Sequence, residues 1–138
     1  MPAFLRLLRL LFSDPSLSRF RIRLASLIYL TILVLGSIPG ARAGVSHVAS
    51  GIVLHSLAYA GLTVLIFCGI NASATRRAVT SVLAIAAMGA IDEFVQSFFS
   101  YRGAAVGDWL VDCAAALVSA AVLFLLWPRA TPAPARVP

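Results

Sequence analysis

Four long runs of apolar residues make up most of the chain. They cover residues 22–38, 52–70, 78–99 and 108–127. Each has about the 20 residues that an α-helix needs to cross a hydrocarbon layer of about 30 Å. The first run is the shortest, and we expect the side chains of Arg21 and Arg23 to extend toward the membrane boundary. The pattern predicts an all-α integral membrane four-helix bundle.

The segments on either side of the four runs differ in character. Residues 1–21 predict a cytoplasmic N-terminal arm, in which Ala3 to Phe12 (AFLRLLRLLF) resembles a short interfacial helix. A frayed tail is the alternative for this segment. The Pro/Ala-rich end predicts a disordered cytoplasmic tail over residues 128–138, which leaves residues 22–127 as the membrane domain. In a competing interpretation, the sequence PGARA before Gly44 is a cleavage site, so that residues 1–43 are a signal peptide and three spans remain.

Composition supports the membrane prediction. The chain is 61% hydrophobic and 12% charged, with a mean hydropathy of +0.97, whereas soluble domains are about half apolar and about a quarter charged. The net charge of +6 invites a nucleic-acid interpretation. However, the arginines lie beside apolar runs and not in a polar, aromatic-rich patch. We therefore expect a lipid bilayer as partner and no nucleic acid, and the oligomeric state is left open.

The arginines are distributed unevenly between the two sides of the predicted bundle. Nine of the eleven fall on the side of the termini: Arg6, Arg9, Arg19, Arg21, Arg23, Arg76, Arg77, Arg129 and Arg136. Only Arg42 and Arg102 fall on the other side. By the positive-inside rule both termini are cytoplasmic and the connections at 39–51 and 100–107 are extracytoplasmic. Cys68 and Cys113 then lie near opposite ends, so no disulfide and no metal site is predicted.

Four of the five acidic residues lie within one stretch of 21 residues, which spans the predicted outer connection. In helical geometry Glu93 and Gln96 share a face, and Asp112 lies one turn below Asp108. The second span adds polar groups at the same depth. The predicted outer-end site comprises His55, Tyr59, Asp92, Glu93, Gln96, Arg102, Asp108 and Asp112.

The energetics of membrane carboxylates require these side chains to face inward. A carboxylate at the centre of the bilayer costs about 2.5–3.5 kcal/mol on insertion scales. Arg102 can pair with one or two of the acids. The remaining acid needs a proton, a cationic His55, a metal ion or a positively charged ligand, and these alternatives stay open.

Structural explanations compete with a functional one. As the first residue after Gly107, Asp108 is better explained as an N-cap. For Asp112, a favourable interaction with the helix dipole is an alternative explanation. His55 and Tyr59 can be ordinary interhelical hydrogen-bonding residues. Asp92 can be hydrated at the rim of the bundle, and Arg102 can close a salt bridge. Glu93 with Gln96 has the weakest structural explanation, so their convergence with the rest favours a functional site.

The same residues resemble a known family. The pattern Glu93-x-x-Gln96, Arg102, Asp108-x-x-x-Asp112, preceded by His55-Ser-Leu-Ala-Tyr59, is similar to the VanZ-like family over roughly residues 25–127. The resemblance implies a four-span bacterial membrane protein, with members linked to teicoplanin resistance and no settled biochemical activity. The chain has Gly51-Ile52 where such proteins often carry Asp-Lys, and alanine around Ala115 where a glycine is common. The missing Asp-Lys counts against a charge relay through His55.

We therefore expect a protein of a bacterial inner or plasma membrane whose outer-leaflet pocket binds a cell-envelope or lipid-linked substrate. Whether the pocket also processes this substrate is left open. The catalytic candidates are Glu93, Asp108, Asp112 and His55; the substrate-binding candidates are Arg102, Gln96, Tyr59 and Asp92. Glu93 would be the acid/base or ion-binding carboxylate and Arg102 the contact for an anionic group. The alternative is a non-enzymatic receptor or scaffold for an envelope ligand. A transporter fits less well because the ionisable groups lie at one end. Cofactors are left open.

Overall fold

The computed structural model describes residues 12–40, 51–101 and 105–127, and within these ranges every regular element is a helix. The elements are the short 3₁₀ turn η1 (Pro15–Leu17) and the helices α2 (Ser18–Gly36), α4 (Gly51–Gly69), α5 (Ala74–Gln96) and α6 (Val106–Leu126). The prediction of an all-helical bundle is confirmed for this part of the chain. The predicted interfacial helix, the C-terminal tail and Arg102 lie outside the described residues.

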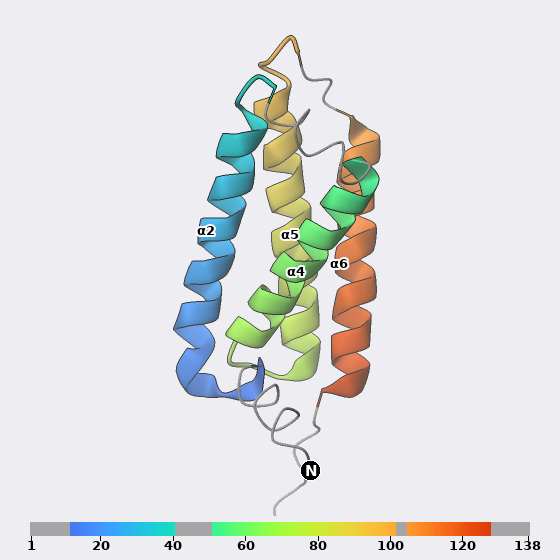
Figure 1. Cartoon of the computed structure of the whole chain (residues 1–138). Coiled ribbons are helices and arrows are strands. Elements are labelled where there is room, and N and C mark those ends of the chain that lie inside the picture. The colour runs from blue at the N-terminus through green and yellow to red at the C-terminus, as the bar shows by residue number, and fades with distance from the viewer. Residues whose placement is uncertain (1–11, 41–50, 102–104, 128–138) are drawn as a thin grey trace, which may run out of the picture.

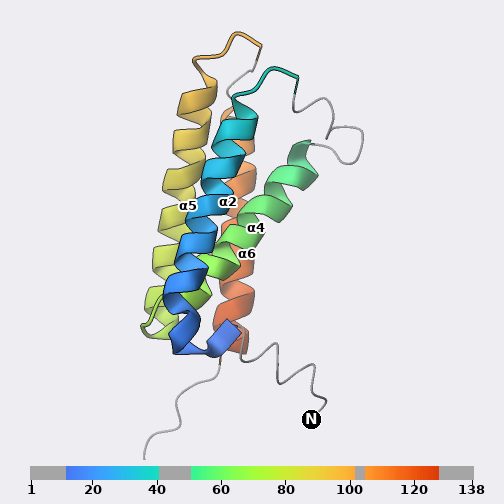
Figure 2. The ribbon, with the colours of Figure 1, turned by 60° about the vertical axis from the view of Figure 1, so that its left-hand side comes forward.

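The four helices run alternately up and down (Figure 1). We call the upper end the one where α2 and α5 end and where α4 and α6 begin, and the lower end the opposite one. Helix α6 packs against both α4 and α5, and α2 packs mainly against α4. The first turns of α4 lean away from the other helices at the upper end (Figure 2). This lean separates the start of α4 from α2 and exposes the sides of its first turns.

The helix boundaries differ from the predicted ones where capping decides them. Helix α4 matches its apolar run to within one residue at each end. Helix α5 begins at Ala74, four residues before the predicted span, because the Ser73 side chain caps it by accepting from the backbone N–H of Arg76. Helix α6 begins at Val106 with Ala105 at the N-cap, so Asp108 is the third helical residue. The expectation that Asp108 is the N-cap is therefore wrong.

Arg21 also departs from its predicted position. Helix α2 begins at Ser18, four residues before the predicted span, so that three arginines lie within its first six residues. The Arg21 side chain is directed toward the end of α4. It is 4% exposed, and its guanidinium donates to the carbonyl of Cys68 at 2.9 Å. The last turn of a helix leaves its carbonyls without partners, and the end of α4 supplies those acceptors.

Apolar side chains cover the surface of the bundle as well as filling its core, and several polar side chains are buried. Within the described residues, the helix surfaces carry exposed leucines such as Leu57 and Leu126, while Asp92, Gln96 and Asp112 are buried. Helices α4, α5 and α6 are each long and apolar enough to cross a membrane. Helix α2 is not among these three, because Arg19, Arg21 and Arg23 lie in its first turns, ahead of its apolar residues. A surface of this kind fits a lipid environment.

Candidate functional site

A buried hydrogen bond joins α4 to α6 in the upper half of the bundle. The Nδ1 atom of His55 lies 3.1 Å from Oδ1 of Asp112. The Asp112 side chain is fully buried and that of His55 is 13% exposed. Both residues were predicted site members on different helices, and the structure brings them into contact. A paired and hydrogen-bonded carboxylate is the form in which a charge-bearing group is tolerated inside a bundle.

A second buried pair joins α4 to α5 beside the first. The hydroxyl of Tyr59 donates to Oδ2 of Asp92 at 3.2 Å, and the two residues are 0% and 3% exposed. The rings of His55 and Tyr59 are stacked, with centroids 5.9 Å apart. Asp92 therefore lies in the interior and not at a hydrated rim. Together the four residues His55, Tyr59, Asp92 and Asp112, which we call the interior network, connect three helices.

Gly89 provides the space for this network on α5. A Cβ atom at Gly89 would lie 3.0 Å from Oδ2 of Asp112 and 3.1 Å from Cδ1 of Trp109. Oδ2 of Asp112 is buried and has no hydrogen-bond partner among the described residues. The glycine thus lets α6 bring a carboxylate and an indole directly against the backbone of α5.

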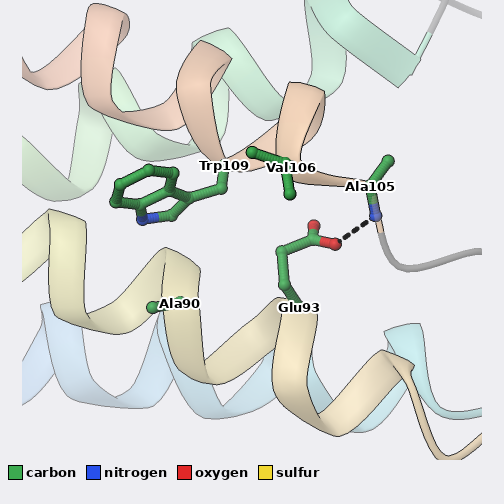
Figure 3. Close-up of a pocket in the computed structure, with 5 residues that line it drawn as sticks. All are labelled: Ala90, Glu93, Ala105, Val106 and Trp109. Carbon is green, nitrogen blue, oxygen red and sulfur yellow. Dashed lines mark hydrogen bonds between the residues drawn. The ribbon is translucent and has the colours of Figure 1, made fainter.

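Glu93 lies outside the interior network, at the upper end of the groove between α5 and α6 (Figure 3). Its Oε2 atom accepts from the backbone N–H of Ala105 at 2.7 Å. A carboxylate at this place stabilises the start of α6, where the N–H groups lack partners and the helix dipole is positive. This bond is a structural role for Glu93 that was not expected from the sequence.

The second oxygen of Glu93 has no such role. Oε1 is buried and has no hydrogen-bond partner among the described residues. Glu93 lines a hollow of about 370 Å³ together with Ala90, Ala105, Val106 and Trp109. Figure 3 shows the carboxylate between the two helices, with the indole of Trp109 directed away from it over Ala90. The hollow is therefore apolar apart from one carboxylate with a free acceptor atom.

Two further predicted residues, Gln96 and Asp108, take no part in the hydrogen bonds described above. Gln96 is 3% exposed, and its Nε2 atom is unpaired among the described residues. Asp108 is half-buried in the first turn of α6, where its negative charge interacts favourably with the positive end of the helix dipole. Within the described ranges, no three His, Cys, Asp or Glu side chains are grouped so as to hold a metal ion. This part of the chain therefore contains no group of side chains that is already arranged as ligands for a metal ion.

Two residues that organise the site were not predicted from the sequence. Trp109 donates from Nε1 to the carbonyl of Ala86 at 2.9 Å and thereby ties α6 to α5. Gly89 permits the close approach described above. An aromatic residue in the first turn of a membrane helix and a glycine in the interior of another are both recognisable signals. Both residues lie close to acidic residues in the sequence, and the prediction of the site was based on those acids.

Together, the fold and this geometry define a class: over the described residues, an all-helical protein with three helices long and apolar enough to cross a membrane, a buried polar network and one carboxylate at a surface hollow. Comparison of the chain with models of protein families, with curated proteins and with solved structures gave no match. The resemblance to the VanZ-like family therefore rests on the residues quoted above and stays a prediction.

Proposed function

We propose that the chain is a multi-pass protein of a bacterial inner or plasma membrane, similar to VanZ-like proteins, in which α2 is a fourth span. Its arginines Arg19, Arg21 and Arg23 lie at the lower end, where they do not interrupt the apolar residues 24–36. The hydroxyl of Tyr29 in α2 donates to the carbonyl of Met88 in α5 at 2.9 Å, which ties α2 into the bundle. The excess of arginine at the lower end supports an orientation with that end in the cytoplasm and the upper end outside.

The function that the geometry supports best is binding of a cell-envelope or lipid-linked ligand in the hollow beside Glu93. The observation that carries this proposal is the buried Oε1 atom of Glu93, which has no hydrogen-bond partner in the described part of the chain and lies in an otherwise apolar hollow. Leaving a buried acceptor without a donor costs about 1–3 kcal/mol, and more for a charged group. A ligand that donates a hydrogen bond to Oε1 would recover that energy.

Binding is better supported than chemistry on the ligand. The carboxylates that have a partner able to exchange a proton, Asp92 and Asp112, are buried in the interior network. In the hollow, Glu93 is the one ionisable side chain among the lining residues. A general acid and base must both reach the reacting atoms. The receptor or scaffold alternative is thus favoured, and a link to teicoplanin susceptibility would follow from the envelope ligand it holds.

The test compares ligand retention in three proteins purified in mild detergent from bacterial membranes: the wild type, Glu93→Gln and Asp14→Asn. Asp14 caps η1 at the lower end, so its variant removes the same charge far from the hollow. Native mass spectrometry should find a small molecule on the wild type and on Asp14→Asn. Retention by Glu93→Gln should fall about ten- to hundredfold, which corresponds to one charged hydrogen bond.

Expression and membrane insertion of all three proteins should be equal, because the amide oxygen introduced by Glu93→Gln can still accept from the N–H of Ala105. Equal retention by the wild type and by Glu93→Gln would contradict the proposal. Incubation of the wild type with membrane extracts tests the processing alternative, since a change in the mass of the bound molecule would show chemistry. Teicoplanin susceptibility of the same strains should change with retention and not with expression.

A further inference from the structure

A second hollow lies below the first, between the same two helices. It measures about 390 Å³ and is lined only by apolar residues, among them Val79, Val82, Leu117 and Ala120. We call it the lower groove. Its lining residues include exposed and half-buried side chains, so it opens on the surface of the bundle.

The spacing of the residues places both hollows on one face of the α5–α6 pair. Val79 and Val82 lie 11 residues before Ala90 and Glu93, and three helical turns contain about 10.8 residues. The same interval separates Val106 and Trp109 from Leu117 and Ala120 on α6. Four of the five residues that line the upper hollow thus have a counterpart in the lower groove on the same face of the helix, roughly 16 Å further down.

The indole of Trp109 lies between the two hollows. Its Nε1 atom is bonded to the carbonyl of Ala86, and Figure 3 shows the ring extending over Ala90 in the direction away from Glu93. The face therefore offers a carboxylate at its upper end, an aromatic ring below it, and an apolar groove below the ring. A polar end and an apolar body in this order match a lipid in the outer leaflet.

We propose that this face binds one outer-leaflet lipid with a primary ammonium head group, its nitrogen at Oε1 of Glu93 and an acyl chain in the lower groove; the inference rests on the proposed function. Charge complementarity carries the choice of head group. Oε1 of Glu93, which no donor in residues 12–40, 51–101 and 105–127 reaches, is a carboxylate oxygen, and a primary ammonium provides three N–H donors with the opposite charge. The distance of about 16 Å matches half of a hydrocarbon layer of about 30 Å.

The test uses Trp109 as a fluorescent reporter. In the Trp127→Phe variant Trp109 is the one remaining tryptophan, and the new ring keeps an aromatic contact for Phe67 and Arg77. The protein is reconstituted in phosphatidylcholine vesicles with phosphatidylethanolamine or phosphatidylcholine brominated on the acyl chains. Both head groups are cationic at nitrogen, but only the ethanolamine has N–H donors. Brominated phosphatidylethanolamine should quench Trp109 at about a tenfold lower mole fraction, as expected for one charge-assisted hydrogen bond.

Matched variants separate the contribution of the lipid head group from that of the acyl chain. Glu93→Gln in the same background should reduce the preference from about tenfold to about threefold or less. Ala121→Phe fills the lower groove and should abolish preferential quenching, while Ala114→Phe, an equally exposed position of α6 outside the groove, should not. In the reciprocal Trp109→Phe variant the reporter is Trp127 at the lower end, and both lipids should quench it equally.

Each outcome decides between the two proposals. A wild type without preference for ethanolamine overturns the lipid inference, and the proposed function survives if native mass spectrometry still shows a molecule that Glu93→Gln loses. If no molecule is retained either, both proposals fail. If none of the brominated lipids quenches Trp109 and the protein elutes as a dimer, the face is occupied by a second copy of the chain. That result would overturn the inference. A preference that Glu93→Gln removes and Ala114→Phe keeps supports it.

Discussion

The contact between Gly89 and Asp112 shows how one missing side chain positions a buried acid. Oδ2 of Asp112 lies where a Cβ atom at residue 89 would approach to 3.0 Å, which is closer than ordinary van der Waals contact. The carboxylate can reach His55 from this position because α6 lies directly against the α5 backbone. The interior network therefore depends on a residue that takes no part in its hydrogen bonds.

A methyl group at residue 89 should accordingly disturb the network. We expect Gly89→Ala to lower the free energy of unfolding in detergent by about 1–3 kcal/mol, because it overpacks the α5–α6 contact. Gly61→Ala is the matched control, since a Cβ atom there meets nothing within 4 Å. That variant should be neutral or stabilising by up to about 1 kcal/mol, from helix propensity. Thermal unfolding followed by circular dichroism checks both, and equal transition temperatures for the two variants would contradict the packing argument.

The bond between Tyr59 and Asp92 should also be measurable by itself. Tyr59→Phe leaves a carboxylate oxygen without its donor in a position that is 3% exposed, which should cost about 1–3 kcal/mol. Tyr101→Phe removes a bond to the carbonyl of Ser37 at the exposed upper end. Water can replace that donor, so we expect a loss of about 0.5 kcal/mol or less. A loss at Tyr59 no larger than at Tyr101 would mean that the interior is hydrated.

At the scale of the helices, the lower end of α4 is held by side chains from its neighbours. Arg21 binds the carbonyl of Cys68, and the guanidinium of Arg77 donates to the carbonyls of Phe67 and Ala72. Ser18 donates to the carbonyl of Gly69. Cations at the C-terminus of a helix satisfy free carbonyls and oppose the negative end of its dipole. The arginines that indicate topology therefore also fix the end of a helix.

Neighbouring arginines offer a matched test of this second role. Arg77 bonds to α4 and lies over the ring of Trp127 at 4.4 Å, whereas the side chain of Arg76 is exposed. We expect Arg77→Gln to destabilise the protein by about 1–3 kcal/mol and to change the fluorescence of Trp127. Arg76→Gln removes the same charge and should change stability by less than about 0.5 kcal/mol. Similar losses for both variants would assign the effect to charge alone.

The sequence predicts the helices of this protein better than it predicts the site. The apolar run that became α4 has the right length and boundaries, because burial in a lipid layer depends on length and composition. The ends of α5 and α6 were less accurate, because they depend on Ser73 and on the backbone at Ala105. Capping of this kind follows from the local backbone path, which apolar periodicity does not contain.

The site was predicted as one cluster, and the structure divides it into two groups. Helix periodicity correctly places His55, Tyr59, Asp92 and Asp112 at a similar depth. Their side chains meet in the interior, whereas Glu93 is the next residue after Asp92 and lies about 100° further around α5. Packing determines which side of α5 faces α4 and which side faces the groove. The contacts of Gly89 and Trp109 fix this rotation of α5. Their roles appear only once the helices are placed together.

At the scale of the whole molecule, the bundle has polar groups at both ends and an apolar surface between them. The lower end carries the arginine contacts of α4, and the upper half holds the interior network and the hollow beside Glu93. Both the ligand proposal and the lipid inference require the upper end to face the outside of the cell.

Labelling of single cysteines in intact cells tests this orientation most directly. Two variants are made in a background with Cys68→Ala and Cys113→Ala, each with a single cysteine. One carries Ser100→Cys at the upper end and the other carries Asn71→Cys at the lower end. Both positions are exposed and lie between helices, so their reactivity depends on the side of the membrane and not on packing. A membrane-impermeant maleimide should label Ser100→Cys in intact cells and Asn71→Cys only after the cells are opened. Labelling of Asn71→Cys in intact cells, with Ser100→Cys protected, would contradict the account.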